Sequence, residues 1–219
     1  MATRILVADD HGIFREGLKR VVGMSVDMTV VDEASSSQEL IGKVRNNDYD
    51  MVILDVSMPG RNGIDALVEL KLIKPKLPVL VLSAHPEEQF ALRAYKYGAS
   101  GYLAKGTAPG ELVAALHEIS SGKKYVSATL AESLVSSGLG NLATRALLSS
   151  LSNREYQVIT LIASGKTVRK IAMELVLSVN TVRSYRAHIL SKLNLKNNAE
   201  LTRFVIEEDF MCVQRRTER

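Results

Sequence analysis

The segment Met51-Val-Ile-Leu-Asp-Val-Ser-Met-Pro-Gly60 runs from apolar residues through one carboxylate, Asp55, into a turn. Its first four residues form the unbroken apolar run that is typical of a strand covered on both faces. Asp55 has a simple structural explanation, because strands must end and aspartate is common beside turns. The rest of the chain decides whether this carboxylate does more than end a strand.

The first 126 residues repeat one pattern five times, a short apolar run followed by an amphipathic stretch. We predict strands at residues 4–8, 28–34, 51–54, 79–82 and 101–104, and helices near residues 11–23, 36–46, 63–73, 87–97 and 110–121. This alternation predicts an α/β domain over residues 1–126, with a five-stranded, doubly wound parallel sheet. In such a sheet the carboxyl ends of the strands form the binding crevice.

The chain changes character after residue 126. Residues 127–147 are rich in Ser, Gly and other small residues, and we predict a linker there, with room for some helix. From Leu151 onward, helical periodicity replaces the strand pattern. Ser152 and Glu155 predict a capping box at the start of a helix, and Gly165 predicts its end.

Three more helices complete the second domain, which we predict over residues 148–219 together with an Arg-bearing C-terminal tail. We expect one helix at 168–175, one that begins at a cap formed by Ser178 or Asn180, and one near 198–208. Short helices joined by tight turns favour a helix-turn-helix arrangement. The second domain is therefore predicted to be a smaller, all-α domain of four helices.

Charge differs between the two halves, although the whole chain carries only +4. Residues 1–126 hold 15 Lys and Arg against 16 Asp and Glu, whereas residues 127–219 hold 13 against 8. The second half therefore has a net charge of +5, which indicates a polyanionic partner for that half.

Several classes of protein are disfavoured by the sequence. No apolar run approaches the ~18 residues of a membrane helix, so no membrane association is expected, and no export signal precedes Asp9. The single cysteine, Cys212, cannot form an internal disulfide, which fits a reducing compartment. The four histidines show no zinc-type spacing. We expect a cytoplasmic protein.

Carboxylates gather at one end of the predicted sheet. Asp9 and Asp10 follow the first strand and Asp55 ends the third, and these two strands are neighbours in a doubly wound sheet. Three like charges this close repel each other unless a cation lies between them, and oxygen ligands suit Mg²⁺. Ser83 and Lys105, at the ends of the fourth and fifth strands, reach the same corner.

This set of side chains fits phosphoryl transfer to a carboxylate. Mg²⁺ neutralises charge on phosphoryl oxygens, while Lys105 and the Ser83 hydroxyl can contact others. Asp55 is the best-placed acceptor, because an ionised carboxylate needs no general base. The turn after it can offer the backbone carbonyl of Ser57 to the metal.

Four motifs resemble the flavodoxin-like receiver domain of two-component response regulators: Ala8-Asp-Asp-His11, Leu54-Asp-Val-Ser-Met-Pro-Gly60, Leu82-Ser-Ala84 and Gly101-Tyr-Leu-Ala-Lys105. The resemblance covers about 120 residues. It implies Mg²⁺ held by Asp9, Asp10 and Asp55, phosphorylation of Asp55, switch residues at Ser83 and Tyr102, and a phosphate-pairing Lys105. Gly106 departs from the Pro or Asp found in many relatives.

The basic half offers one helix suited to DNA, starting near residue 179. Its residues Val182, Ile189 and Leu193 form a stripe predicted to be buried. The opposite side can enter a major groove and the helix start can hold a phosphate, which makes these residues candidate DNA contacts: Asn180, Thr181, Arg183, Ser184, Arg186 and Ala187. Lys166, Arg169, Lys170 and Lys192 are predicted to add backbone contacts. The alternative is a merely solvated amphipathic helix.

Four stretches of this half resemble the LuxR-type helix-turn-helix: Leu151-Ser-Asn-Arg-Glu155, Ile171-Ala172, Leu177-Ser-Val-Asn-Thr-Val-Arg183 and Lys192-Leu193. With the receiver, the whole chain resembles a NarL/FixJ-type response regulator. Tyr185 stands where relatives commonly have His, and Val168, Lys170 and Asn198 also depart from frequent residues, which bears on the target sequence.

The resemblance implies a phosphorylation-regulated transcription regulator, not an enzyme. A sensor histidine kinase or a small acyl phosphate is expected to phosphorylate Asp55, to bias Tyr102 inward and to promote a homodimer on double-stranded promoter DNA. One rival is a DNA-binding regulator whose receiver serves only for dimerisation. Another is a Mg²⁺-dependent phosphatase, although such sites usually have a second acid two residues after the nucleophile, where this chain has Ser57.

Overall fold

The structure is a computed structural model of the whole chain, and it describes all residues except 1, 57, 59–62, 85–86, 137–150 and 206–219. The chain divides into two compact units, Met1–Leu130 and Ala131–Arg219. No helix in the described part is long and apolar enough to span a membrane.

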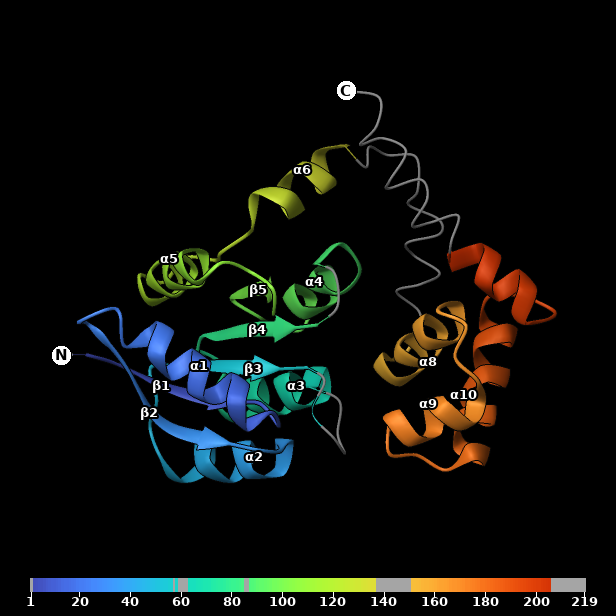
Figure 1. Cartoon of the computed structure of the whole chain (residues 1–219), viewed down its shortest axis with the longest axis horizontal. Coiled ribbons are helices and arrows are strands. Elements are labelled where there is room, and N and C mark those ends of the chain that lie inside the picture. The colour runs from blue at the N-terminus through green and yellow to red at the C-terminus, as the bar shows by residue number, and fades with distance from the viewer. Residues whose placement is uncertain (1, 57, 59–62, 85–86, 137–150, 206–219) are drawn as a thin grey trace. The chain divides into compact units, whose positions relative to one another are not determined.

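The first unit is built on one parallel sheet. Its strands are β1 (Thr3–Ala8), β2 (Met28–Ala34), β3 (Met51–Asp55), β4 (Val79–Ser83) and β5 (Gly101–Ala104). They are hydrogen-bonded in the order β2-β1-β3-β4-β5, and every pair is parallel (Figure 1). The predicted fold class is confirmed, and each predicted strand lies within one residue of its observed bounds.

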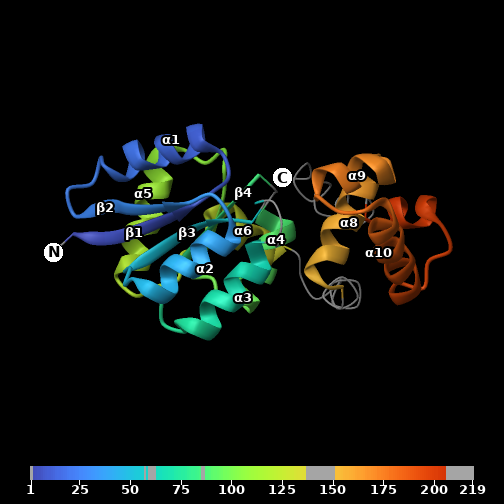
Figure 2. The ribbon, with the colours of Figure 1, turned by 90° about the horizontal axis from the view of Figure 1, so that it is seen from below.

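Helices cover both faces of this sheet, as the doubly wound pattern requires. They are α1 (Gly12–Val22), α2 (Ser37–Asn46), α3 (Gly63–Ile73), α4 (Glu87–Lys96) and α5 (Pro109–Ser120). Helices α1 and α5 pack together on one face, while α2 and α3 pack together on the other (Figure 2). The strands β3 and β4 are buried at every position, which explains their unbroken apolar sequences.

One hydrophobic cluster fills the layer between the sheet and the helices α1 and α5. It includes Ile5, Ile53 and Leu103 from the strands and Leu116 from α5, all at most 1% exposed. Leu6 and Leu54 are equally buried, outside that cluster. Burial on both sides fixes the positions of the strands, and hence of the side chains at their carboxyl ends.

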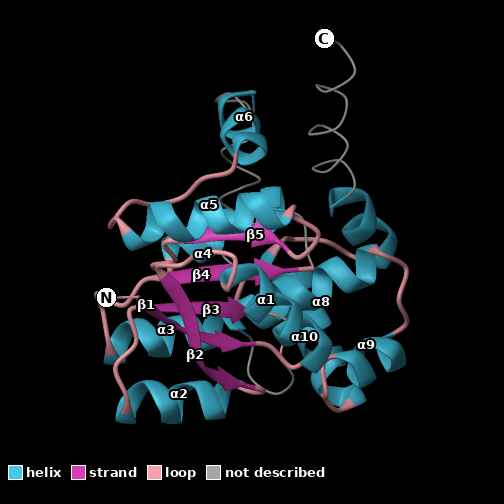
Figure 3. Cartoon of the chain, turned by 60° about the vertical axis from the view of Figure 1, so that its left-hand side comes forward, coloured by secondary structure: helices cyan, strands magenta, loops and turns pink. Residues whose placement is uncertain are grey.

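The segment predicted as a linker contains helix α6 (Ala128–Ser136), which Figure 3 shows beyond the loop that leaves α5. The residues 137–147 of that segment lie outside the described part. The described part of the segment therefore contains the helix for which its composition left room.

The second unit contains α8 (Asn153–Ala163), α9 (Val168–Glu174) and α10 (Val179–Lys192), followed by helical residues 198–205. Helix α10 packs against both α8 and α9. The predicted all-α domain is confirmed in its described part. The predicted fourth helix reaches residue 208, and residues 206–208 lie outside the described part.

Local sequence signals explain where these helices begin and end. Ser152 and Glu155 form the predicted capping box, and Gly165 ends α8 with φ +79°. Of the two candidate caps of α10, Ser178 is the one used, since its hydroxyl accepts a hydrogen bond from the Thr181 backbone N–H. A tight turn then joins α9 to α10, with Val176 at φ +53°.

Candidate functional site

The carboxylates of Asp9 and Asp55 lie at the same rim of the sheet. Ala8 pairs with Leu54 across β1 and β3, so the next residue of each strand emerges at the same level. Both aspartates are 1% exposed. Parallel strand ends therefore bring together two buried charges that are 46 residues apart in sequence, as predicted.

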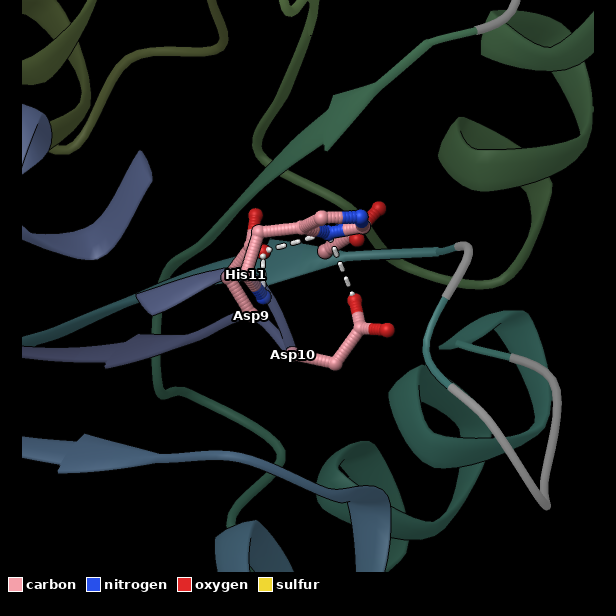
Figure 4. Close-up of side chains that lie close together, drawn as sticks. Asp9, Asp10 and His11 are labelled. Atoms are coloured by element: carbon pink, nitrogen blue, oxygen red, sulfur yellow. Dashed lines mark hydrogen bonds and ion pairs between the residues drawn. The ribbon is translucent and has the colours of Figure 1, made fainter. Parts of the chain in front are cut away.

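Asp10 and His11 complete the cluster. His11 Nδ1 lies 2.9 Å from Asp10 Oδ1 and 3.3 Å from Asp9 Oδ1, and the His11 backbone N–H donates to Asp9 Oδ1 at 2.8 Å. Figure 4 shows the imidazole turned back toward both acids. Sequence reasoning did not assign His11 to the site. Its position directly after the two acids, at the start of α1, was the available signal.

Lys105 supplies the positive charge of the site. Its Nζ lies 2.7 Å from Asp9 Oδ2 and 2.8 Å from Asp55 Oδ2. Burial by itself would lower the pKa of Lys105, but hydrogen bonds to Asp55 and Asp9 outweigh that effect and the pKa is raised. The ammonium group is therefore charged at neutral pH, and the predicted pairing position at the end of β5 holds a cation between the two buried acids.

The first turn of α1 holds this arrangement from the other side. The ring of Phe14 lies 4.7 Å from Lys105 Nζ, a cation–π distance. Arg15 Nη1 donates to the Asp9 carbonyl at 2.6 Å, and Arg15 Nε donates to Glu33 at 2.8 Å. Neither Phe14 nor Arg15 was predicted for the site, because only the tertiary structure brings them to it.

Gly63 is required beside Asp55 for a steric reason. A Cβ atom at Gly63 would lie 2.3 Å from Val56 Cα and 2.5 Å from the Asp55 carbonyl oxygen, closer than atoms can approach. The Gly63 N–H also donates to the Val56 carbonyl at 3.1 Å. The start of α3 therefore packs directly against the backbone that carries Asp55.

The two predicted switch residues are both fully buried. Ser83 ends β4 beside this rim, and its carbonyl accepts a hydrogen bond from the Lys105 backbone N–H at 2.7 Å. Tyr102 lies in β5 with its ring 0% exposed. The structure thus contains an inward Tyr102 already, so the expected inward movement on phosphorylation is not needed to reach this position. Ser57, predicted to offer its carbonyl to a metal, lies outside the described residues.

The donor set fits a divalent cation. One ligand atom from each of Asp9, Asp10, His11 and Asp55 lies within 4.8 Å of all the others. Asp9 Oδ2 and Asp10 Oδ1 are both buried, and they face Lys105 Nζ at 2.7 Å and His11 Nδ1 at 2.9 Å. Carboxylate oxygens are the ligands that Mg²⁺ prefers.

The second unit presents the other candidate surface, on α10. Val182, Ile189 and Leu193 are 0–5% exposed, which confirms the predicted buried stripe. The side chains of the predicted DNA-facing side are exposed at Asn180, Arg183, Ser184 and Ala187 and half-buried at Thr181 and Arg186.

Several predicted contact residues have partners within the unit. The Thr181 hydroxyl lies 2.8 Å from the Ser178 hydroxyl, and Arg186 Nε donates to Asn198 at 2.5 Å. Lys166 pairs with Glu174 at 2.6 Å. These bonds are at the surface and leave the side chains within reach of solvent.

Lys192 differs from these surface pairs. Its Nζ lies 2.7 Å from Glu155 Oε2, and the Glu155 side chain is only 5% exposed. This ion pair joins the end of α10 to the capping box of α8, which gives Lys192 a structural role that the sequence prediction lacked. Arg169 and Lys170 are exposed on α9.

Two family models match the chain. The model described as "Response regulator receiver domain" matches residues 5–117, and "Bacterial regulatory proteins, luxR family" matches residues 149–205. The first unit therefore matches a receiver domain and the second a LuxR-type helix-turn-helix domain, and this combination places the protein in the class of response regulators.

The chain belongs to the two-component response regulators of the NarL/FixJ type. Response regulator UvrY of Escherichia coli K12 is 35% identical over 202 residues, 92% of this chain and 93% of the relative. NarL of the same organism is 35% identical over 205 residues, 93% and 95% of the two chains. A solved structure of RcsB from Salmonella enterica serovar Typhimurium, bound to promoter rprA with phosphomimetic BeF3-, matches with a TM-score of 0.66 and 27% identity, covering 93% of this chain and 98% of that one.

The family establishes the class of function. Response regulators of this type are DNA-binding transcription regulators controlled by phosphorylation, a class that is usually non-enzymatic. Receiver domains typically bind Mg²⁺ in an acidic pocket, and their partner is a histidine kinase.

Proposed function

We propose that Asp55 accepts a phosphoryl group and that this modification controls DNA binding through α10. The observation that carries the proposal is the pairing of half-buried Lys105 with two buried acids, since Lys105 Nζ lies 2.7 Å from Asp9 and 2.8 Å from Asp55. Domains at 1–126 and 148–219, joined by a linker at 127–147, are part of the proposal.

The transfer step requires little from the protein beyond position and charge. A carboxylate oxygen of Asp55 attacks the phosphorus of a phosphohistidine or an acyl phosphate. The new P–O bond forms while the P–N bond to the histidine, or the P–O bond to the acyl group, breaks, and the leaving group departs on the opposite side. Lys105, held between Asp9 and Asp55, is placed to move its pairing from a carboxylate to a phosphoryl oxygen.

Asp9, Asp10 and Asp55 are the proposed Mg²⁺ ligands, with the Ser57 carbonyl as a further ligand. The ion supplies neutralisation of the charge on the phosphoryl oxygens. Ser83, buried at the end of β4, is placed to donate to another oxygen. These roles follow from the donor chemistry and from the positions of the strand ends.

Phosphorylation then has to shift a conformational equilibrium. Moving a two-state receiver from 1:99 to 99:1 takes roughly 5.5 kcal/mol of differential stabilisation. New charge-assisted bonds to Lys105 and Ser83 are of the right kind to supply much of it. Because Tyr102 is already buried, we propose that these bonds stabilise its inward position rather than create it.

On the DNA side, the exposed face of α10 is proposed to enter the major groove. Arg183 and Arg186 are the candidates for base contacts, with Ser184 and Ala187 small enough to allow a close approach. Asn180, Thr181, Lys166, Arg169 and Lys170 are proposed to contact phosphates. Lys192 is proposed to contact a phosphate only while it stays paired with buried Glu155.

The proposed partners are a sensor histidine kinase, a second copy of the chain on activation, and promoter DNA, in the cytoplasm. Two-fold symmetric dimers bind paired half-sites, which would place two α10 helices about one helical turn apart. No catalytic turnover is proposed.

The test compares the wild type with Asp55→Asn, both incubated with acetyl phosphate and Mg²⁺. The wild type is expected to gain one phosphoryl group by intact mass, to dimerise and to bind DNA more tightly. Asp55→Asn is expected to do none of these. A variant that still dimerises and binds DNA more tightly would contradict the proposal. Wild type that incorporates no phosphate would favour a receiver used only for dimerisation, and repeated turnover of a phosphate ester would favour the phosphatase.

A further inference from the structure

The chain stays bound to the first unit after α5 ends. Five residues beyond Ser120, the Tyr125 backbone N–H donates to the Ser100 carbonyl at 2.9 Å, beside the start of β5. The Tyr125 side chain is 8% exposed and belongs to the cluster under α1 and α5. Tyr125, in the segment 121–127 that joins α5 to α6 (the exit segment), is therefore part of the core of the first unit.

Two hydroxyl groups fix this point further. Tyr95, in the last turn of α4, donates its hydroxyl hydrogen to the Tyr125 carbonyl at 2.5 Å. Tyr125 donates its own to Glu111 of α5 at 2.8 Å. A Cβ atom at Gly101 of β5 would lie only 3.3 Å from Tyr125 Cβ. Residue 125 is thus tied at once to α4, β5 and α5.

The next helix starts directly from this anchor. The Ser127 hydroxyl, in a side chain that is buried, accepts a hydrogen bond from the Leu130 backbone N–H at 3.1 Å and so fixes the first turn of α6. Leu130 is 1% exposed. Figure 3 shows the loop from α5 leading into α6. Only Val126 separates Tyr125 from the cap Ser127, so a movement of Tyr125 has to be passed on to the first turn of α6.

We propose that Tyr95 and Tyr125 are positioning residues that pass the state of the phosphorylation site to α6, and so to the chain that leads to the DNA-binding unit. This inference rests on the proposed function. Helix α4 follows the strand that ends in Ser83, and β5 carries Tyr102 and leads to Lys105. Any shift of α4 against β5 has to move the Tyr125 carbonyl or break its bond to the Tyr95 hydroxyl.

A packing role alone does not account for this geometry. A phenylalanine at position 95 would keep the ring and its contacts, but would lose the bond that reaches out of α4 to the exit segment. Tyr97, two residues further along, provides a matched comparison, because its hydroxyl makes no hydrogen bond to any residue that the structure describes.

The experiment uses the full chain as wild type, Tyr95→Phe and Tyr97→Phe, each with and without acetyl phosphate and Mg²⁺. Phosphorylation is followed by intact mass. DNA affinity is measured on a double-stranded fragment enriched from genomic DNA by the phosphorylated wild type. The rate of hydrogen exchange at the Leu130 backbone amide reports how firmly the first turn of α6 is held.

Tyr95→Phe is expected to be phosphorylated as fast and as fully as the wild type, but its gain in DNA affinity on phosphorylation falls by roughly threefold or more. Exchange at Leu130 becomes faster, and its response to phosphorylation shrinks. Tyr97→Phe behaves as wild type in each measurement.

Equal gains for Tyr95→Phe and Tyr97→Phe would overturn the inference, as would a Tyr95→Phe protein that is phosphorylated poorly, since that would indicate general damage to the fold. A wild type that is phosphorylated without any gain in DNA affinity would overturn the proposed function itself, and this inference with it.

Discussion

The rim of the sheet and the exposed face of α10, the two sites proposed for phosphoryl transfer and DNA binding, are built in opposite ways. At the rim, Asp9 and Asp55 are buried and Lys105 is half-buried, and the three are paired within 2.8 Å at the ends of three strands. On α10, Arg183 and its neighbours are exposed, and their bonds are local. A site that performs a transfer reaction needs charges organised in advance, whereas a surface that reads DNA receives its partners when the DNA arrives.

This contrast predicts different responses to mutation. Substitutions at the rim should disturb the backbone or the charge pairing, so their effects should be large and should include a loss of stability. Changes on α10 should act on DNA binding without affecting the fold.

The largest effect is expected for Gly63→Ala. Its Cβ would lie 2.3 Å from Val56 Cα, so the backbone at Asp55 and Val56 has to move, at a cost of about 3 kcal/mol in unfolding free energy. Mg²⁺ affinity and phosphorylation by acetyl phosphate fall with it. Gly42→Ala, in α2 with nothing within 4 Å of the new atom, is the control and is expected to stabilise by about 0.8 kcal/mol. Equal results in urea denaturation would contradict the account.

A smaller effect, confined to DNA, is expected for Arg183→Ala. Losing a bidentate base contact costs about 1–3 kcal/mol of binding free energy on a selected DNA site. Lys196→Ala removes the same charge from an exposed position outside α10 and should weaken binding less and without regard to sequence. Titrations at several salt concentrations separate the two, and equal losses on all sequences would show that Arg183 contacts phosphates only.

The second unit also contains an ion pair with a buried carboxylate, between Lys192 and Glu155, and its contribution to stability can be tested by varying the pH. Burial raises the pKa of Glu155, but hydrogen bonds from Lys192 and Ser152 outweigh it and hold the pKa below its usual 4.5. A lowered folded-state pKa means that the stabilisation is present above the unfolded-state pKa and is lost as the pH falls through the folded-state value.

Glu155→Gln is therefore expected to lower the unfolding free energy of the second unit by roughly 1–2 kcal/mol at pH 7, and to remove most of its loss of stability below pH 4.5. Methyl NMR signals of Val158 and Ile159, followed in urea at several pH values, provide the measurement. An unchanged pH dependence would show that the pair contributes nothing.

The smallest effect concerns the turn between α9 and α10. Val176 has φ +53°, a left-handed conformation that a β-branched residue adopts at a cost. Val176→Gly relieves that strain and is expected to raise stability by about 0.5–1 kcal/mol, with DNA affinity unchanged. Thermal unfolding checks the sign, and a destabilised variant would mean that the exposed Val176 side chain makes contacts that outweigh the strain.

The sequence predicted this protein best where burial dictates the pattern. The strand run 51–54 is apolar because both faces are covered, so β3 and the position of Asp55 at its end followed directly. The Ser152–Glu155 capping box and the buried stripe of Val182 and Ile189 were equally local signals, and both were confirmed.

What the sequence could not predict depends on residues that meet only in three dimensions. Phe14 reaches Lys105 from 91 positions away, and nothing in its surroundings in the chain indicates a cation partner. Lys192 looked like a surface cation for DNA, because its partner Glu155 lies 37 residues earlier. The choice between Ser178 and Asn180 as a cap depends on backbone geometry that either residue could have provided.

The most direct test of the central claim is to locate the phosphoryl group. The full chain is treated with acetyl phosphate and Mg²⁺, the acyl phosphate is trapped by reduction, and the peptides are mapped by mass spectrometry. We expect a single modified residue, Asp55, and no incorporation of phosphate when Mg²⁺ is chelated before acetyl phosphate is added. A phosphoryl group found on another residue, or incorporation unaffected by chelation, would contradict it.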